Sequence, residues 1–168
     1  MSIDVLIRNA VPDDAAGVIA ILNPIIEDGR YTMFDTPFTL ESERTYIETL
    51  TDRDSFLVAV RTDDNAVVGF QSMSPLAAFS HAFDHVGVMG TYVEQSTRRQ
   101  GIAKRLFPAT FDAARSKGYE KIFTYIRADN PVALDTYQKH GFRVIGTAER
   151  HAKVQDRYVD VLLVERQL

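Results

Sequence analysis

One stretch in the second half of the chain constrains the fold more than any other, because an apolar strand pattern runs through a short polar loop into a helical pattern. The strand covers Val86 to Val93, and the helix covers Gly101 to Lys117. Backbone N–H groups at the start of a helix, together with the helix dipole, favour a bound anion. The short side chains of Gly101 and Ala103 would let a pyrophosphate approach the backbone. The segment therefore predicts an anion site where the strand meets the helix.

Basic side chains surround the same junction, namely Arg98, Arg99, Lys104 and Arg105. The alternative interpretation is a basic surface helix that merely begins with small residues. An Arg-x-x-Gly-x-Ala pattern on its own does not separate the two interpretations. Its position directly after an apolar strand favours the anion site.

The other hydrophobic patterns place this junction in one domain, residues 1–168, because a chain of 168 residues without a linker or repeat favours a single core. Further strands are predicted at Val5–Arg8, Phe56–Val60, Ala66–Met73, Lys121–Ile126, Phe142–Thr147 and Arg157–Glu165. Further helices are predicted at Pro12–Asp28, Thr39–Leu50 and Pro131–His140. Pro108 is expected to weaken or bend the helix that begins at Gly101. The order of elements predicts an α/β fold with a mixed sheet and helices on both faces.

Two glycines, Gly87 and Gly90, interrupt the strand from Val86 to Val93. Glycine inside a strand often marks a bulge or a close backbone approach. A bulge would splay this strand from the next one, Lys121 to Ile126, and an amide-bearing ligand could then pair with the exposed edge as an added strand does. The alternative is a strand that is simply irregular.

A second candidate segment begins at Asn130-Pro131, after the strand Lys121 to Ile126. Asn130 suits the N-cap of a helix, and Tyr137 lies about two turns further on, on the same side. A phenol in that place could donate a proton to a departing thiolate. Capping alone would also explain Asn130, and a contact with the core would explain Tyr137.

Composition excludes several classes of function. The formal net charge of -4 argues against a general nucleic-acid binder. Because the chain has no cysteine, disulfides, thiolate metal sites and a cysteine nucleophile are excluded. The polar start and the lack of an apolar run of roughly 20 residues predict a cytoplasmic protein with no membrane partner. His81-x-x-x-His85 would suit a metal only on a helix, and the segment has a loop pattern, so no metal is expected.

Together the two segments resemble the Gcn5-related N-acetyltransferase (GNAT) superfamily, in which the sheet splays between its fourth and fifth strands. The acetyl-coenzyme A motif matches VGVMGTYVEQSTRRQGIAKRL, and the following strand and helix match FTYIRADNPVALDTYQKHGFRVIG. The resemblance implies that the backbone of Val93 pairs with pantetheine and that Arg98 to Lys104 wraps the pyrophosphate. It also implies that Asn130 and Tyr137 lie beside the cofactor and its sulfur. The residues expected at acetyl-coenzyme A are Tyr92, Val93, Arg98, Arg99, Gln100, Gly101, Ile102, Ala103, Lys104 and Asn130.

A narrower resemblance covers most of the chain and points to the phosphinothricin and methionine-sulfone acetyltransferase branch. It rests on the segments IRNA from residue 7, ILNPII from residue 21, MFDTP from residue 33 and RYVDV from residue 157. The resemblance implies a small-molecule amine as acceptor and a homodimer. That branch typically places a glutamate on the central strand as a candidate base, whereas the aligned position here is Val88. A preference for phosphinothricin itself is therefore not predicted.

The predicted reaction is direct attack of a neutral amine on the thioester, with Tyr137 as the acid that protonates the thiolate. Glu94 is a candidate base acting through water, and Asp84 and His85 flank the same strand as alternatives. Two other functions would share the cofactor motifs, namely acetylation of a protein α-amine and a non-catalytic module that senses acyl-coenzyme A.

The acceptor pocket is predicted to contain Tyr31, Phe34 and Asp35. These residues, beside acidic groups at the end of the first helix, would suit a cationic amine. The other interpretation is a packed loop next to a solvated helix end.

Overall fold

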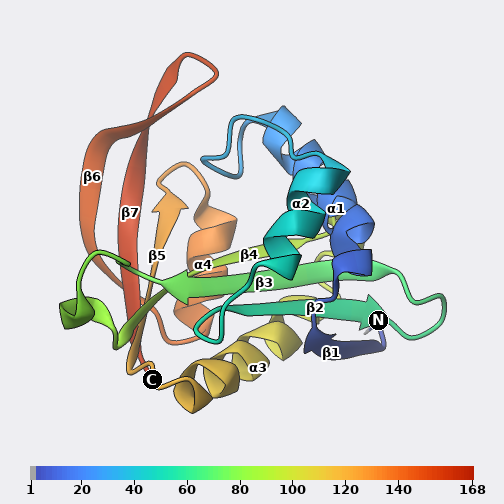
Figure 1. The fold of residues 1–168 in the computed structure, drawn as a ribbon. Coiled ribbons are helices and arrows are strands. Elements are labelled where there is room, and N and C mark those ends of the chain that lie inside the picture. The colour runs from blue at the N-terminus through green and yellow to red at the C-terminus, as the bar shows by residue number, and fades with distance from the viewer. Residues whose placement is uncertain (1–2) are drawn as a thin grey trace.

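The computed structural model describes residues 3–168 and contains a seven-stranded mixed sheet with helices on both faces (Figure 1). The strands are β1 Val5–Asn9, β2 Ser55–Arg61, β3 Val67–Pro75, β4 Val86–Val93, β5 Lys121–Arg127, β6 Arg143–Val154 and β7 Arg157–Gln167. The α-helices are α1 Ala15–Asp28, α2 Leu40–Glu48, α3 Ile102–Ser116 and α4 Pro131–Lys139. Short 3-10 helices lie at Pro12–Asp14, His81–Phe83 and Gln95–Thr97. The predicted fold class is confirmed.

The sheet divides between β4 and β5. Its order is β1-β2-β3-β4-β5-β7-β6, and β4 with β5 is the parallel pair. That pair extends only over Val86–Val88 and Lys121–Phe123, after which the two strands diverge (Figure 1). The divergence was predicted, but the predicted bulge is wrong for the ladder between β3 and β4, which runs from Gly69 to Pro75 without a register shift. The strands splay because their parallel pairing ends early, and no extra residue is inserted opposite β3.

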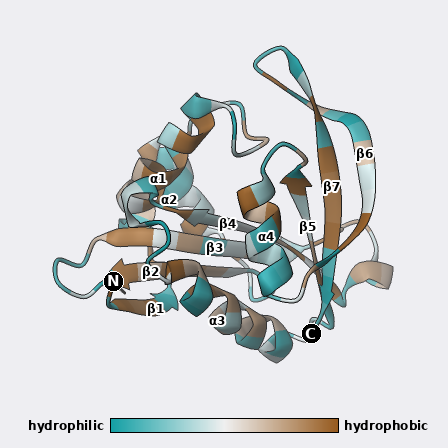
Figure 2. Ribbon diagram, turned by 180° about the vertical axis from the view of Figure 1, so that it is seen from behind, coloured by the Kyte–Doolittle hydropathy of each residue, from teal (hydrophilic) through white to brown (hydrophobic). Residues whose placement is uncertain are grey.

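Three hydrophobic clusters hold the helices to the sheet. On one face, α1 packs its apolar side, including Val18 and Leu22, against Phe56 and Phe70 of β2 and β3. On the other face, α3 supplies Leu106 to one cluster and Phe107 to another. Figure 2 shows apolar residues along the strands in the middle of the sheet and on the inner sides of the helices. The end of β4 therefore lies between helices on both sides.

One strand is longer than expected, and Pro108 lies inside a continuous helix, where its predicted weakening or bending effect stays a prediction. The strand predicted to end at Thr147 continues to Val154, where it forms a long hairpin with β7. Exposed polar residues such as Glu149 and His151 break the apolar alternation there, so pairing with β7 and not burial keeps the chain extended. Pro108 does not interrupt α3, because it lies on the exposed side, where water can serve the carbonyl of Lys104 that loses its helical partner.

Candidate active site

A cleft of about 950 Å³ opens where β4 leaves β5, and most of the residues predicted from the sequence line it. Its walls come from the end of β4, the loop and first turn of α3, the exposed side of α4 and two residues near the end of α1. The lining residues used below are Tyr31, Thr91, Tyr92, Val93, Arg98, Arg99, Gly101, Ile102, Ala103, Lys104, Asn130, Asp135 and Tyr137. Two segments that are separate in the sequence thus form one site.

The loop before α3 has a backbone conformation that few residues adopt. Gly101, the N-cap of α3, has φ of 85°, in the left-handed region where a side chain is strained. A Cβ atom at Gly101 would meet no atom within 4 Å, so the space in front of the helix start is open. The first N–H groups of α3 face this space without helical partners, and Arg98, Arg99 and Lys104 line it. The loop can therefore receive an anionic group.

The C-terminal part of β4 has a free edge on the side that faces β5. Pairing with β5 stops at Val88, and beyond it the carbonyl of Met89 accepts a hydrogen bond of 2.6 Å from the Thr124 hydroxyl. Thr91 and Val93 follow on β4 and line the cleft. An extended ligand that carries amides could pair with this edge as an added strand would.

Tyr137 reaches the cleft from α4 and is held by contacts on several sides. Its side chain is only 7% exposed, and its ring packs edge-on against Phe107 and Phe142. Its hydroxyl lies 2.8 Å from the Thr91 hydroxyl. Burial raises the pKa of the Tyr137 phenol above its ordinary value, and the hydrogen bond with Thr91 acts in the opposite direction. The phenol is therefore protonated at neutral pH.

Asn130 caps α4, as one of the two interpretations predicts. Its side-chain oxygen accepts a hydrogen bond of 3.1 Å from the backbone N–H of Ala133. Asn130 also lines the cleft. Capping and contact with a ligand are compatible, because the cap places the side chain at the mouth of the same cleft.

The opposite face of β4 carries an aromatic group that the loop after α1 completes. Tyr92 stacks on Phe70 with ring centroids 5.1 Å apart, and Phe34 lies 6.3 Å from the Tyr92 ring. The Tyr92 hydroxyl is 3.3 Å from the Thr32 hydroxyl. Burial raises the pKa of Tyr92. The loop thus folds back onto its own sheet, while Phe34 remains 44% exposed.

Arg127, which was not selected from the sequence, holds this loop from the end of β5. Arg127 is buried at the end of β5 and donates hydrogen bonds of 2.6 Å to the Gly29 carbonyl and 3.2 Å to the Thr32 carbonyl. Its guanidinium also pairs with Asp129 at 2.8 Å. A charged residue that closes an apolar strand was the available signal. The segment from Gly29 to Phe34 contains two of the residues predicted for the acceptor pocket, Tyr31 and Phe34, and is called the acceptor loop below.

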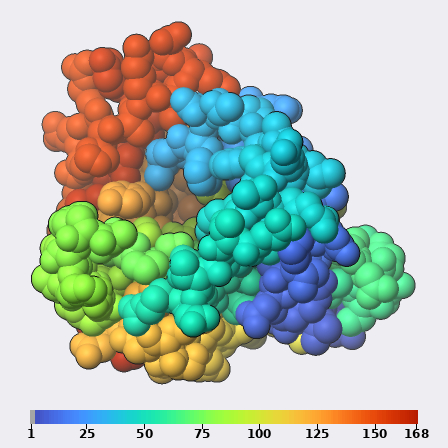
Figure 3. All heavy atoms as spheres, viewed as in Figure 1, coloured from blue at the N-terminus to red at the C-terminus, as the bar shows by residue number. Residues whose placement is uncertain are grey.

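The β6–β7 hairpin lies against the end of α1 near this loop, as the space-filling view shows (Figure 3). The amide of Gln155 donates to the Glu27 carbonyl at 3.2 Å. Residues that are far apart in the sequence therefore meet beside this loop.

Four predicted site residues do not line the cleft, namely Glu94, Gln100, Phe34 and Asp35. The carboxylate of Glu94 accepts from the Ser96 hydroxyl at 2.8 Å, beyond the end of β4. Asp35 accepts from the Thr36 hydroxyl at 3.1 Å, and Gln100 donates to the Ser96 carbonyl. Their assigned roles stay predictions. The alternative bases Asp84 and His85 lie before the first residue of β4, at the opposite end from Thr91.

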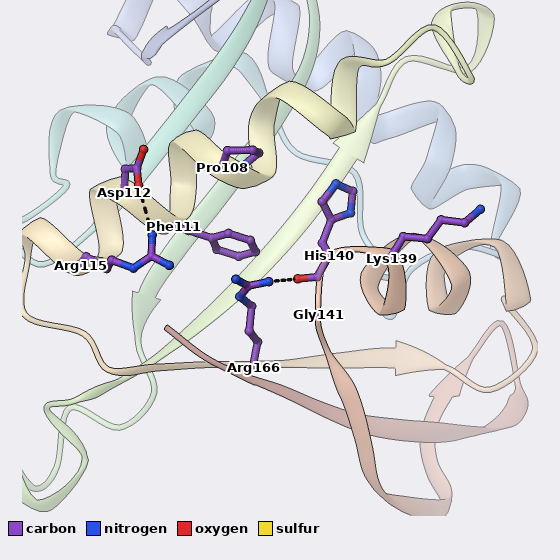
Figure 4. Close-up of a pocket in the computed structure, with 8 residues that line it drawn as sticks. All are labelled: Pro108, Phe111, Asp112, Arg115, Lys139, His140, Gly141 and Arg166. Atoms are coloured by element: carbon purple, nitrogen blue, oxygen red, sulfur yellow. Dashed lines mark hydrogen bonds and ion pairs between the residues drawn. The ribbon is translucent and has the colours of Figure 1, made fainter.

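A smaller hollow of about 530 Å³ lies at the other end of α3, against the end of α4 and β7 (Figure 4). There Arg166 donates to the His140 carbonyl and stacks over the Phe111 ring, while Arg115 pairs with Asp112. None of the predicted site residues lines this hollow. The larger cleft is therefore the candidate active site.

Among residues 3–168, no group of three or more His, Cys, Asp or Glu side chains could hold a metal ion. In the same range, no helix is both long and apolar enough to cross a membrane.

Comparison with known proteins gives a consistent result. Residues 24–142 match the model of the Acetyltransferase (GNAT) family. The chain is 25% identical over 167 residues to a phosphinothricin N-acetyltransferase of Streptomyces coelicolor, a match that covers 98% of this chain and 97% of the relative. It is 23% identical over 166 residues to an L-methionine sulfoximine/L-methionine sulfone acetyltransferase of Pseudomonas aeruginosa, covering 96% and 94%. The crystal structure of a ribosomal-protein-alanine N-acetyltransferase from Brucella melitensis superposes with a TM-score of 0.90 at 27% identity, covering 97% and 99%.

Proposed function

Since the chain belongs to the acetyltransferase (GNAT) family, we propose that it transfers the acetyl group of acetyl-coenzyme A directly to the amine of a small molecule. One observation carries this proposal: the open amino end of α3, the free edge of β4 and the hydroxyl of Tyr137 all border a single cleft.

The residues present fit acetyl-coenzyme A. Its pyrophosphate matches the N–H groups and the basic side chains around Gly101. Its pantetheine amides match the unpaired edge of β4 from Thr91 to Val93. When bound, acetyl-coenzyme A supplies an acetyl thioester, and the cleft has room for it beside Tyr137.

In this mechanism, backbone N–H groups at the end of β4 donate to the carbonyl oxygen of the thioester and stabilise negative charge there. The amine attacks in its neutral form, since a protonated amine has no free electron pair. Tyr137 holds a proton on its hydroxyl and gives it to the departing sulfur. The chain has no cysteine, which agrees with direct transfer and not with an acetyl-cysteine intermediate.

The amine must lose a proton, and the structure limits which groups near the cleft could accept it. Asp135, the carboxylate that lines the cleft, faces Lys139 at 2.6 Å, and Glu94 accepts from Ser96 outside the lining. Val88 offers no carboxylate on β4. We propose that the enzyme selects the neutral fraction of the amine, with Glu94 acting through water as the alternative. At pH values below the pKa of the amine, the rate would then rise with pH as the neutral fraction of the amine grows.

The proposed acceptor is an amino-acid-like amine. Two relatives that match nearly the whole chain are named for phosphinothricin and for methionine sulfoximine or sulfone. Arg127 holds the acceptor loop in place, and the β6–β7 hairpin lies next to it. This arrangement suits a small acceptor better than an extended peptide. Acetylation of a protein α-amine is the second candidate, because the Brucella melitensis neighbour is named for a ribosomal protein.

We also propose that the protein is a cytoplasmic homodimer. The acceptor loop and its neighbours leave Tyr31 and Phe34 partly exposed, and an apolar patch of this kind suits an interface. Light scattering at micromolar concentration would give twice the mass of one chain. A mass near that of one chain would contradict the proposed dimer without affecting the proposed reaction.

Two measurements test the proposed function. Acetyl-coenzyme A should raise the melting temperature, since a ligand at 100 times its Kd adds about 2.7 kcal/mol to the free energy of unfolding. Release of free coenzyme A should depend on an amine, in a panel of amino acids, their sulfone analogues, polyamines, aryl amines and short peptides. A thermal shift without release for any amine would favour the non-catalytic sensor, and release with peptides alone would favour the protein acetyltransferase.

A further inference from the structure

A line of four polar side chains crosses the core beneath the cleft and ends at Tyr137. Thr110 of α3 donates a hydrogen bond of 2.6 Å to the side-chain oxygen of Gln71 on β3. The amide nitrogen of Gln71 donates to the Thr91 hydroxyl at 3.0 Å, and that hydroxyl lies 2.8 Å from the Tyr137 hydroxyl. Gln71 is 0% exposed.

Packing does not require these groups. Gln71 and Thr91 lie directly opposite each other on β3 and β4, where a pair of apolar residues would also fit the sheet. A buried hydrogen bond contributes little net free energy to stability, and replacing both partners by apolar groups of the same shape is nearly neutral. A buried amide is costly when it is left unpaired, so this line constrains the core without adding much stability.

The line has a direction. Because Thr110 donates to the Gln71 oxygen, the Gln71 nitrogen faces Thr91 and occupies a lone pair of its hydroxyl. The proton of that hydroxyl is then free to point at the oxygen of Tyr137. A phenol has one proton, and if Tyr137 donated it to Thr91, none would face the cleft.

We propose that Gln71 and Thr91 are positioning residues that direct the phenolic proton of Tyr137 into the cleft, an inference that rests on the proposed role of Tyr137 as acid. In the step concerned, the bonding pair of the C–S bond goes to sulfur, and the O–H bond of Tyr137 breaks as an S–H bond forms. The phenolate that results accepts the hydrogen bond of Thr91. It regains a proton, through water, from the amine nitrogen, which loses one N–H proton as the amide forms.

The test compares Thr91→Val, which keeps the shape and loses the hydroxyl, with Thr91→Ser, which keeps the hydroxyl. Thr91→Val and Gln71→Met should lower kcat by roughly 10- to 100-fold, the range for a lost hydrogen bond to a charged group. The Kd of acetyl-coenzyme A, measured by calorimetry, should change less than about twofold. That change is well below the tenfold change in Kd that 1.4 kcal/mol would produce. Thr91→Ser should recover most of the lost kcat.

A second measurement separates positioning from general packing. In a Tyr137→Phe background, Thr91→Val should cause no further loss of kcat, because the hydroxyl that it serves is gone. An equal further loss in that background would overturn the inference, and so would a normal kcat for Thr91→Val when Tyr137→Phe is slow. If Tyr137→Phe alone keeps its kcat, the acid role itself fails. Thr110→Val, at the far end of the line, provides the same comparison if Gln71→Met does not fold.

Discussion

The two sides of the cleft are built differently. On the side proposed to bind acetyl-coenzyme A, called the cofactor side below, Thr91 to Lys104 and Asn130 to Lys139 form two continuous segments, each a strand or turn that runs into a helix. On the side proposed to bind the amine, called the acceptor side below, single residues from distant parts of the chain meet. Arg127 bonds to Gly29 across 98 positions, and Gln155 bonds to Glu27 across 128.

This difference separates what local rules can predict from what they cannot. A helix start creates an anion site from its own backbone, so a short pattern is sufficient to indicate it. A loop that is held by an arginine on another strand has no local pattern, because its contacts exist only after the sheet has formed. We therefore expect changes on the cofactor side to act on acetyl-coenzyme A, and changes on the acceptor side to act on the amine.

The largest expected effect is at Gly101. Gly101→Val should abolish the thermal shift by acetyl-coenzyme A, because a branched side chain would occupy the open space before α3 and strain a backbone at φ of 85°. Gly118→Val is the matched control, since Gly118 has φ of 83° just beyond the other end of the same helix. Both variants should lose about 1–2 kcal/mol of stability. Loss of the ligand shift in both would mean that strain, and not the site, is responsible.

The second effect is at Tyr137. Tyr137→Phe should lower kcat by roughly 100-fold, a typical size for general acid catalysis, with little change in the Kd of acetyl-coenzyme A. Single-turnover kinetics would ensure that the chemical step is measured. An unchanged rate under those conditions would leave Tyr137 with only its packing against Phe107 and Phe142.

The third effect tests the acceptor side. Arg127→Met removes the hydrogen bonds to the carbonyls of Gly29 and Thr32 and should raise the KM for the amine by about tenfold, as loss of a hydrogen bond from a charged group implies. The Kd of acetyl-coenzyme A should stay within about twofold. Arg143→Met is the control, because Arg143 pairs with Glu165 at the start of β6. Equal changes in the KM for the amine and in the Kd of acetyl-coenzyme A would show that the two sides do not act separately.

A smaller effect is expected at Phe34. Phe34→Ala should raise the KM for the amine by a few-fold, on the order of the 1 kcal/mol that a partly exposed aromatic contact contributes. Acetyl-coenzyme A affinity should remain nearly intact. Phe79→Ala provides the comparison, since Phe79 is 85% exposed in the connection between β3 and β4. Similar KM values for the amine in the two variants would show that Phe34 takes no part in acceptor recognition.

The smallest effect links the two sides. The guanidinium of Arg98, on the cofactor side, lies 5.1 Å from the ring of Tyr31 on the acceptor side. A double-mutant cycle with Arg98→Met and Tyr31→Leu should give a coupling of about 0.5–1 kcal/mol in acetyl-coenzyme A binding, as expected for an exposed cation–π pair. A coupling indistinguishable from zero would show that the two sides bind their ligands independently.

The sequence by itself determined the local elements and the cofactor side. Apolar periodicity predicted the strand from Val86 to Val93 at its observed bounds, and Asn130 and Gly101 were predicted as the starts of the two helices of the site. These features depend on residues within a few positions of one another, where backbone preference and helix geometry act directly. The helix start at Gly101 and the position of Tyr137 along α4 follow from the same local rules.

Only the tertiary structure decided which side chains meet across the sheet. The early end of the β4–β5 pairing opens the cleft without the bulge that the glycines suggested. Gln71 reaches Thr91 because two strands are in register, and Arg127 reaches the acceptor loop because β5 ends beside it. Contacts of this kind depend on the packing of whole elements, whose free energy comes from many residues at once, and no short stretch of sequence encodes them.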